Sequence, residues 1–298
     1  MQLAPIIIFA FNRKHALEAC IYSLLQNNEA KDSDLIVLVD GSRPDHMGEA
    51  EKVADVREYV KGISGFKSLT YHFSEANKGV GASIIEGVSH IIKQYGKAVI
   101  IEDDLIVSSN FLTFINQGLA LYEQNKMVFS VCGYTNKVKI PSDYHYDAYF
   151  CPRSSSWGWA TWEDRWCSCD WVLEDWDSVQ RNANAFNKWG GSDCYGMLKV
   201  WKEGKNRSWA IRFCYNQFIQ NKVSLFPVIS HVVNNGFDGE GENCPKWSRF
   251  KCDFDESDNK EFLYPDRIEI NKDLFKAAMS YNTLLARGYS KIMNFFYR

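Results

Sequence analysis

Ile100-Ile101-Glu102-Asp103-Asp104 decides the fold, because an apolar run that begins at Ala98 leads directly into three adjacent carboxylates. Like charges repel, and buried carboxylates are costly unless a cation or hydrogen-bond donors meet them. A divalent cation is the simplest compensation, since carboxylate oxygens suit Mg²⁺ or Mn²⁺ and these ions usually bridge to substrate phosphates. The motif therefore indicates a metal and phosphate site, although a solvated acidic turn after a strand fits these five residues equally well.

The composition is that of an ordinary globular protein. With 298 residues, 46% of them apolar, the chain can form one large domain or two modest ones. The net charge is only -3, so no positive field favours nucleic acid, and we expect none as a partner. Aromatic residues make up 15% and include ten Trp. Their faces suit sugar rings and bases, but Trp also fills cores.

The sequence also indicates the cellular compartment. The N-terminus has no basic segment or cleavage site, so a signal peptide is not expected, and no apolar stretch approaches membrane-spanning length. Nine Cys without a secretory signal are typical of reduced thiols in a cytoplasmic protein. Cys167-Ser168-Cys169 has no second pair at zinc-binding spacing, so structural zinc is not expected.

The first half of the chain alternates strand and helix patterns, which predicts an α/β fold with a mostly parallel sheet and helices on both faces. Expected strands cover 5–11, 35–39, 69–73, 98–101 and 127–132, and expected helices cover 17–25, 47–61, 80–95 and 110–124. The second half is less regular. It has strand patterns at 148–151, 223–226 and 231–233, a Trp-rich segment at 157–176, a helix at 211–219 and a long polar loop at 236–267.

The C-terminal segment, 273–298, has a basic amphipathic helical pattern. Such a helix can lie peripherally on an anionic membrane surface, here the inner face of the membrane. Packing of its apolar stripe back onto the domain is the more common outcome for a helix of this kind.

Polar residues follow each of the first four predicted strands. In an open parallel sheet the ligand lies outside the carboxyl ends of the strands, so these residues should converge on one edge. Besides the acidic motif they are Phe11-Asn12-Arg13, Asp40-Gly41-Ser42 and Asn77-Lys78-Gly79-Val80-Gly81. Asp40 can accept from a base or a ribose, while Asn12 and Arg13 supply donors. Gly79 begins a helix whose N-terminus favours anions. Each motif alone also fits a plain turn or helix start.

The order of these motifs resembles the nucleotide-sugar-dependent glycosyltransferases of the GT-A fold. The acidic motif, followed by Trp157-Gly158-Trp159-Ala160-Thr161-Trp162, is most similar to bacterial relatives of the N-acetylglucosaminyltransferase I family. The resemblance covers about residues 5–240. It implies a donor-binding half at 1–135, an acceptor-binding and catalytic half at 136–240 in the same domain, and a loop with a helical extension at 241–298.

The resemblance implies roles for the strand-end residues. Asp104 would bind the divalent cation, Mn²⁺ or Mg²⁺, that bridges the donor diphosphate, while Glu102 and Asp103 would reach the ribose or metal-bound water. The rest of the expected nucleotide-binding set is Phe11, Asn12, Arg13, Asp40, Asn77, Lys78 and Gly79. Lys78 departs from the pattern of the family, and its side chain points either at phosphate or at solvent.

An inverting transferase needs a carboxylate that deprotonates the acceptor hydroxyl. Candidates are Glu163, Asp164, Asp175, Asp177 and Asp193. We predict Asp193, which follows Gly190-Gly191-Ser192 and precedes a helix, although a helix cap is an equal alternative. Glu163 and Asp164 are the alternative candidates for this base.

The acceptor half supplies candidates for sugar binding. Trp157, Gly158 and Trp159 are expected at the sugar or acceptor, with Ser154, Ser155 and Ser156 for hydroxyls. Trp159 and Trp162 are spaced i, i+3, so one of them can be core. His231 is a further possible metal ligand, but a lone His is more often structural.

The leading hypothesis is therefore metal-dependent transfer of a sugar, with inversion, from a uridine-linked nucleotide sugar to a glycan or lipid-linked glycan. A sugar nucleotidyltransferase is one alternative, but Phe11-Asn12-Arg13-Lys14-His15 lacks its Gly-rich phosphate loop. A non-catalytic carbohydrate-binding protein with this fold is another, and an intact acidic cluster disfavours it.

Overall fold

Successive residues of strand β1 (Ile6–Ala10) are buried on opposite faces of the sheet. Ile6 and Ile8 join one apolar cluster and Ile7 and Phe9 join another, as expected where successive side chains of a strand alternate. Both faces are covered, which explains why β1 is apolar throughout. The computed structural model describes residues 2–237 and 247–296.

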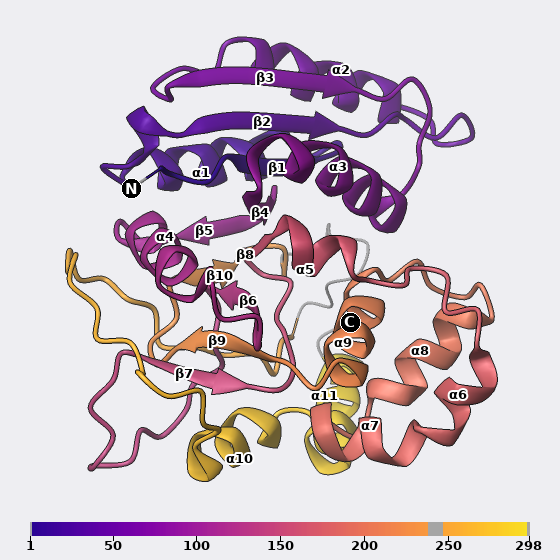
Figure 1. Cartoon of the computed structure of the whole chain (residues 1–298). Coiled ribbons are helices and arrows are strands. Elements are labelled where there is room, and N and C mark those ends of the chain that lie inside the picture. Colours follow the sequence, from indigo (N-terminus) through magenta and orange to yellow (C-terminus); the bar gives the residue numbers. More distant parts are fainter. Residues whose placement is uncertain (1, 238–246, 297–298) are drawn as a thin grey trace.

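A mixed sheet of eight strands organises the molecule (Figure 1). Its order is β3-β2-β1-β4-β8-β6-β9-β7, and the first four strands are parallel. Besides β1, its strands are β2 (Asp34–Val39), β3 (Ser68–Phe73), β4 (Lys97–Glu102), β6 (Val128–Cys132), β7 (Ala148–Cys151), β8 (Trp159–Trp162) and β9 (Val223–Pro227). β5 (Leu105–Val107) and β10 (Val232–Asn234) form a small antiparallel sheet. The predicted α/β class is confirmed.

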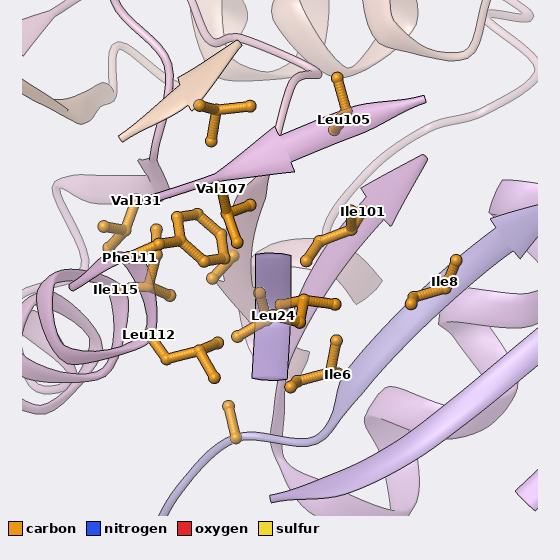
Figure 2. Packing of buried hydrophobic residues seen from close by; sticks show 14 of the residues in the cluster. Ile6, Ile8, Leu24, Ile101, Leu105, Val107, Phe111, Leu112, Ile115 and Val131 are labelled. Carbon is orange, nitrogen blue, oxygen red and sulfur yellow. The ribbon is translucent and has the colours of Figure 1, made fainter. Parts of the chain in front are cut away.

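One face of the sheet is covered by α1 (Lys14–Leu25), α2 (Glu49–Lys61) and α4 (Phe111–Tyr122). Figure 2 shows part of this cluster, in which Leu24 of α1 and Phe111 of α4 share a core with Ile6, Ile8 and Ile101 of the strands. The other face is covered by α3 (Val80–Tyr95), α5 (Glu163–Cys167) and α9 (Ala210–Ile219). A short 3₁₀ turn, η1, covers Ala30–Asp32.

Three expectations for the second half are corrected. Trp159–Trp162 is strand β8, inserted antiparallel between β4 and β6, so both Trp side chains are buried on the sheet. The segment after it contains two helices that we did not predict, α6 (Trp176–Arg181) and α7 (Ala183–Gly190), followed by the helix expected after Asp193, α8 (Cys194–Lys202). The C-terminal helix is two helices, α10 (Lys272–Ser280) and α11 (Leu284–Phe296). Of the predicted loop, 238–246 lies outside the described residues.

Strands from the predicted donor and acceptor halves share the large sheet, so its carboxyl edge is built from both. Across residues 2–237 and 247–296, no helix combines the length and the apolar character needed to cross a membrane.

Candidate active site

A cleft of about 1490 Å³ lies along the carboxyl ends of β1 to β4. The expected nucleotide-binding residues all line it: Phe11, Asn12, Arg13, Asp40, Asn77, Lys78, Gly79, Glu102, Asp103 and Asp104. Segments distant in sequence close the other side, including 205–210 and 247–250. The convergence predicted for the four strand ends is therefore present in the folded chain.

Arg13 is the central cation of the acidic motif. Its Nη2 donates to Asp103 Oδ1 at 2.9 Å and to Asp104 Oδ2 at 2.8 Å, so one guanidinium nitrogen joins both carboxylates. The backbone N–H of Phe11 donates to the second oxygen of Asp103 at 3.2 Å. These contacts explain how the fold holds adjacent carboxylates, because a charged donor offsets their repulsion and their loss of water.

Burial sets the protonation of this cluster. It raises the pKa of Asp103 to about 6, even though Arg13 acts in the opposite direction. Burial also raises the pKa of Glu102 to about 8, and the charges of Asp104 and Asp103 add to the effect. Burial lowers the pKa of Arg13, but the two carboxylates outweigh this and leave its pKa above the ordinary value. At neutral pH, Glu102 is thus largely protonated and Arg13 is charged.

Asp104 has the free coordination capacity that a metal ligand needs. Within the described residues its Oδ1 accepts no hydrogen bond, and its side chain lines the cleft. Gly236 lies against it, since a Cβ at residue 236 would be 2.2 Å from Asp104 Oδ2. No group of three His, Cys, Asp or Glu among the described residues could hold an ion by itself. The arrangement fits a cation held by one or two carboxylates and completed by substrate phosphates.

Asp40 fixes the start of α3. Its carboxylate accepts from the backbone N–H of Lys78 at 2.9 Å and from that of Gly79 at 2.8 Å. Asn77 Nδ2 donates to the carbonyl of Gly41 at 2.9 Å, and a Cβ at Gly41 would be 2.4 Å from the Ala76 backbone. The Asp-Gly pair therefore holds the loop before the helix against β2, in addition to lining the cleft.

The glycines of that loop permit a close approach by residue 207. Gly79 has φ +77°, which favours glycine, and a Cβ at Gly81 would be 2.0 Å from the Arg207 carbonyl. Lys78 turns away from this contact, because its Nζ donates to Glu86 at 2.6 Å on the exposed surface. Of the two directions considered for Lys78, the structure has the solvent-facing one.

Asn12 and Phe11 lie at the opposite wall. Asn12 Nδ2 donates to Glu49 at 3.2 Å, and the backbone N–H of Arg43 donates to the same carboxylate at 2.8 Å. The Arg43 guanidinium lies 5.5 Å from the centroid of the Phe11 ring. A flat ring next to a cationic group is a surface on which a base can stack.

The Trp-rich segment separates into a cleft residue and a core residue. Trp157 lines the cleft, and its ring packs 4.5 Å from Tyr134 and 5.8 Å from Phe250, centroid to centroid. Trp159 is fully buried and stacks on Trp209 at 4.9 Å, so it does not face the cleft. Gly158 has φ +59° and turns the chain between them.

The proposed base lies off the cleft. Asp193 is buried, and Arg153 donates to its two oxygens at 2.8 and 3.2 Å. It precedes α8, but its side chain makes no capping bond. Asp164 is half-exposed and pairs with Lys126 and Arg165. Every carboxylate that lines the cleft among the described residues comes from the first 104 positions.

His231 is structural. Its Nδ1 lies 2.9 Å from Asn110 Oδ1 and 3.1 Å from Ser108 Oγ, and its ring packs on Phe114. Burial lowers its pKa to about 4, so the ring is neutral. His231 does not line the cleft among the described residues, so its position favours the structural role over the metal-ligand role.

Sequence reasoning missed several residues that line the cleft: Lys205, Arg207, Trp247, Arg249 and Ser290. No motif marks them, because they reach the cleft from loops and from the C-terminal helix. The only available signal was the basic pair around 205–207 just before α9.

A mostly parallel sheet whose strand ends place an acidic motif and a helix N-terminus in one cleft is the arrangement of the GT-A fold of glycosyltransferases. The sequence agrees: residues 6–169 match Glycosyl transferase family 2. More than half of the chain is matched, so the chain belongs to this family.

Solved structures also match this chain, at low similarity. The mannosyltransferase PcManGT from Pyrobaculum calidifontis, in complex with GDP-Man and Mn²⁺, is 13% identical, with TM-score 0.38 over 54% of this chain and 45% of that one. S. aureus TarS is 11% identical, with TM-score 0.39 over 76% and 35%. The chain thus spans less than half the length of either protein. A comparison with curated protein sequences gives no match.

Proposed function

We propose that this glycosyltransferase moves a sugar from a nucleotide diphosphate sugar, uridine-linked, to a hydroxyl of a glycan or lipid-linked glycan in the cytoplasm. The observation that carries the proposal is the pair Asp103 and Asp104 at the end of β4, joined by Arg13 and facing a cleft with an aromatic wall. The relation to the N-acetylglucosaminyltransferase I family, and hence an N-acetylhexosamine donor, stays a prediction.

In the proposed arrangement, Phe11 and Arg43 flank the base, and Asp103 and Glu102 lie near the ribose. Glu102 is protonated at neutral pH, so it can donate a hydrogen bond to a ribose oxygen. A Mn²⁺ or Mg²⁺ ion on Asp104 would supply charge neutralisation for the leaving diphosphate. Arg13 holds the Asp104 side chain at the cleft, and Trp157 offers a face for the sugar or acceptor.

Transfer with inversion is a single displacement. The acceptor oxygen forms a bond to the anomeric carbon, the bond from that carbon to the diphosphate oxygen breaks, and the acceptor proton passes to a carboxylate. Asp193 stays our sequence-based candidate for that base, but it does not line the cleft among the described residues, so this role requires it to reach the acceptor from outside that lining. Because Arg153 holds both of its oxygens, Asp193 must exchange part of this ion pair for the acceptor hydroxyl.

The test is a panel of nucleotide sugars in which release of nucleoside diphosphate is followed with and without Mn²⁺. Asp104→Ala should remove metal-dependent release, while Glu58→Ala, on an exposed surface pair with Lys61, should not change it. Release that is equal in EDTA would refute the metal role. Asp193→Asn should retain donor binding and lose transfer by about a hundredfold or more, and retained transfer would move the base to Glu163 or Asp164.

A further inference from the structure

Helix α11 presents its apolar side to solvent. Six large apolar residues on it are between 56% and 87% exposed: Leu284, Leu285, Tyr289, Ile292, Phe295 and Phe296. Ser290 is the only buried residue of the helix. Leu285, Tyr289, Ile292 and Phe296 recur at i, i+4, i+7 and i+11, so they form one stripe. A surface helix of a globular protein normally buries such a stripe, and here the orientation is reversed.

Polar groups attach the helix to the body of the protein. Arg287 Nη1 donates to the carbonyl of Ser192 at 3.3 Å, and Asn294 Oδ1 accepts from the backbone N–H of Trp247 at 3.2 Å. The inward side is therefore defined by hydrogen bonds, which fixes the apolar stripe on the outside.

The segment that contains α11 carries positive charge and no negative charge. Residues 274–298 contain no Asp or Glu and four basic residues: Lys276, Arg287, Lys291 and Arg298. Lys291 is exposed on α11 beside the stripe. The positive charge of this segment and the solvent-facing apolar stripe of α11 together complement an anionic interface whose interior is apolar.

We propose that α11 docks on an anionic phospholipid surface, with the stripe from Leu285 to Phe296 in the headgroup region. A second copy of the chain fits less well. A contact between two copies would bring together two segments that carry basic residues and no Asp or Glu, and their repulsion would oppose the apolar gain. An anionic bilayer complements both the apolar stripe of the helix and the positive charge of the segment.

The position of α11 connects this surface to the cleft. Ser290, on the inward side of the same helix, lines the cleft, and Trp247 packs on Tyr289 with ring centroids 5.5 Å apart. Docking through α11 would thus hold the cleft next to the headgroups. If the proposed function is correct, the acceptor is a glycan on a lipid anchor, delivered from the bilayer.

Vesicle sedimentation tests the docking without requiring any turnover. The chain should bind phosphatidylcholine vesicles containing about a third phosphatidylglycerol, and bind pure phosphatidylcholine at least tenfold more weakly. Leu285→Glu and Phe295→Glu should each weaken binding to the mixed vesicles at least tenfold. Lys291→Gln should weaken it about fivefold. Leu121→Glu, at an exposed apolar position on α4, is the matched control and should bind as the unmodified chain does.

Equal binding to both vesicle types, or unchanged binding of Leu285→Glu, would overturn the proposal. So would a dimer in light scattering that Leu285→Glu dissociates, because a second copy would then cover the stripe. The comparison of vesicle types uses the unmodified chain, so it stands even if a variant folds poorly. Vesicle binding without any release of nucleoside diphosphate would refute the proposed function and leave the docking intact.

Discussion

Removal of the guanidinium of Arg13 is the sharpest perturbation of the acidic motif. Arg13→Met retains much of the side-chain volume but leaves Asp103 and Asp104 without the cation that joins them at 2.9 and 2.8 Å. The carboxylate side chains are only 8% and 10% exposed, so water cannot replace the lost donor fully. The folded state should therefore be destabilised.

The burial of the Arg13 ion pairs sets the expected loss in the free energy of unfolding. Loss of one partner from a buried ion pair typically costs about 3–5 kcal/mol. The Arg13 side chain is 18% exposed, so we expect a value at the lower end, about 3 kcal/mol. Lys14→Met is the matched control, because Lys14 is exposed and pairs with Glu18 at 3.6 Å on the helix surface. Such a pair contributes about 0.3–0.5 kcal/mol.

Urea unfolding followed by tryptophan fluorescence, in EDTA, measures both variants. The loss in Arg13→Met should be larger at pH 8 than at pH 5. Without the guanidinium the carboxylates hold protons more readily, and at low pH they become neutral and no longer need a partner. A loss below about 1 kcal/mol, or one equal at both pH values, would refute the assigned role of Arg13.

Three further outcomes are expected. The pKa of Glu102 is about 8 and that of Asp103 about 6, both raised on folding, so their stabilising contribution is present at low pH and is lost as pH rises through these values. Metal-free protein should lose up to about 1.4 kcal/mol per pH unit per group, from both groups up to about pH 6 and from Glu102 alone between about pH 6 and 8. Glu102→Gln should therefore flatten the upper part of that urea-unfolding profile. Gly81→Ala should lower the melting temperature by several degrees, because its Cβ would be 2.0 Å from a carbonyl, whereas Gly196→Ala, with no atom within 4 Å, should not.

The first half of the fold was predictable because its strands and helices have clean periodicity and no competing constraint. The α3 pattern, for example, predicted 80–95, and the helix covers Val80–Tyr95. The convergence of the four strand ends followed from topology alone, since parallel strands place their carboxyl ends at one edge. The residues that line the cleft at these four strand ends could thus be predicted from the sequence.

The second half could not be predicted in the same way, because tertiary contacts override local pattern there. Trp159 and Trp162 have helical spacing but lie in β8, where pairing with β4 and β6 determines the conformation. Arg13 was expected as a nucleotide ligand, yet its bridge to Asp103 and Asp104 depends on long-range contacts between β1 and β4. The outward stripe of α11 contradicts the more common expectation that it packs onto the domain.

Calorimetric titration of uridine diphosphate, with Mn²⁺ and then with EDTA, tests the central claim most directly. A cation on Asp104 completed by the donor diphosphate predicts that EDTA weakens binding at least tenfold, about 1.4 kcal/mol, and that Asp104→Ala binds equally weakly in both conditions. Binding by the unmodified chain with the same Kd in Mn²⁺ and in EDTA would contradict it.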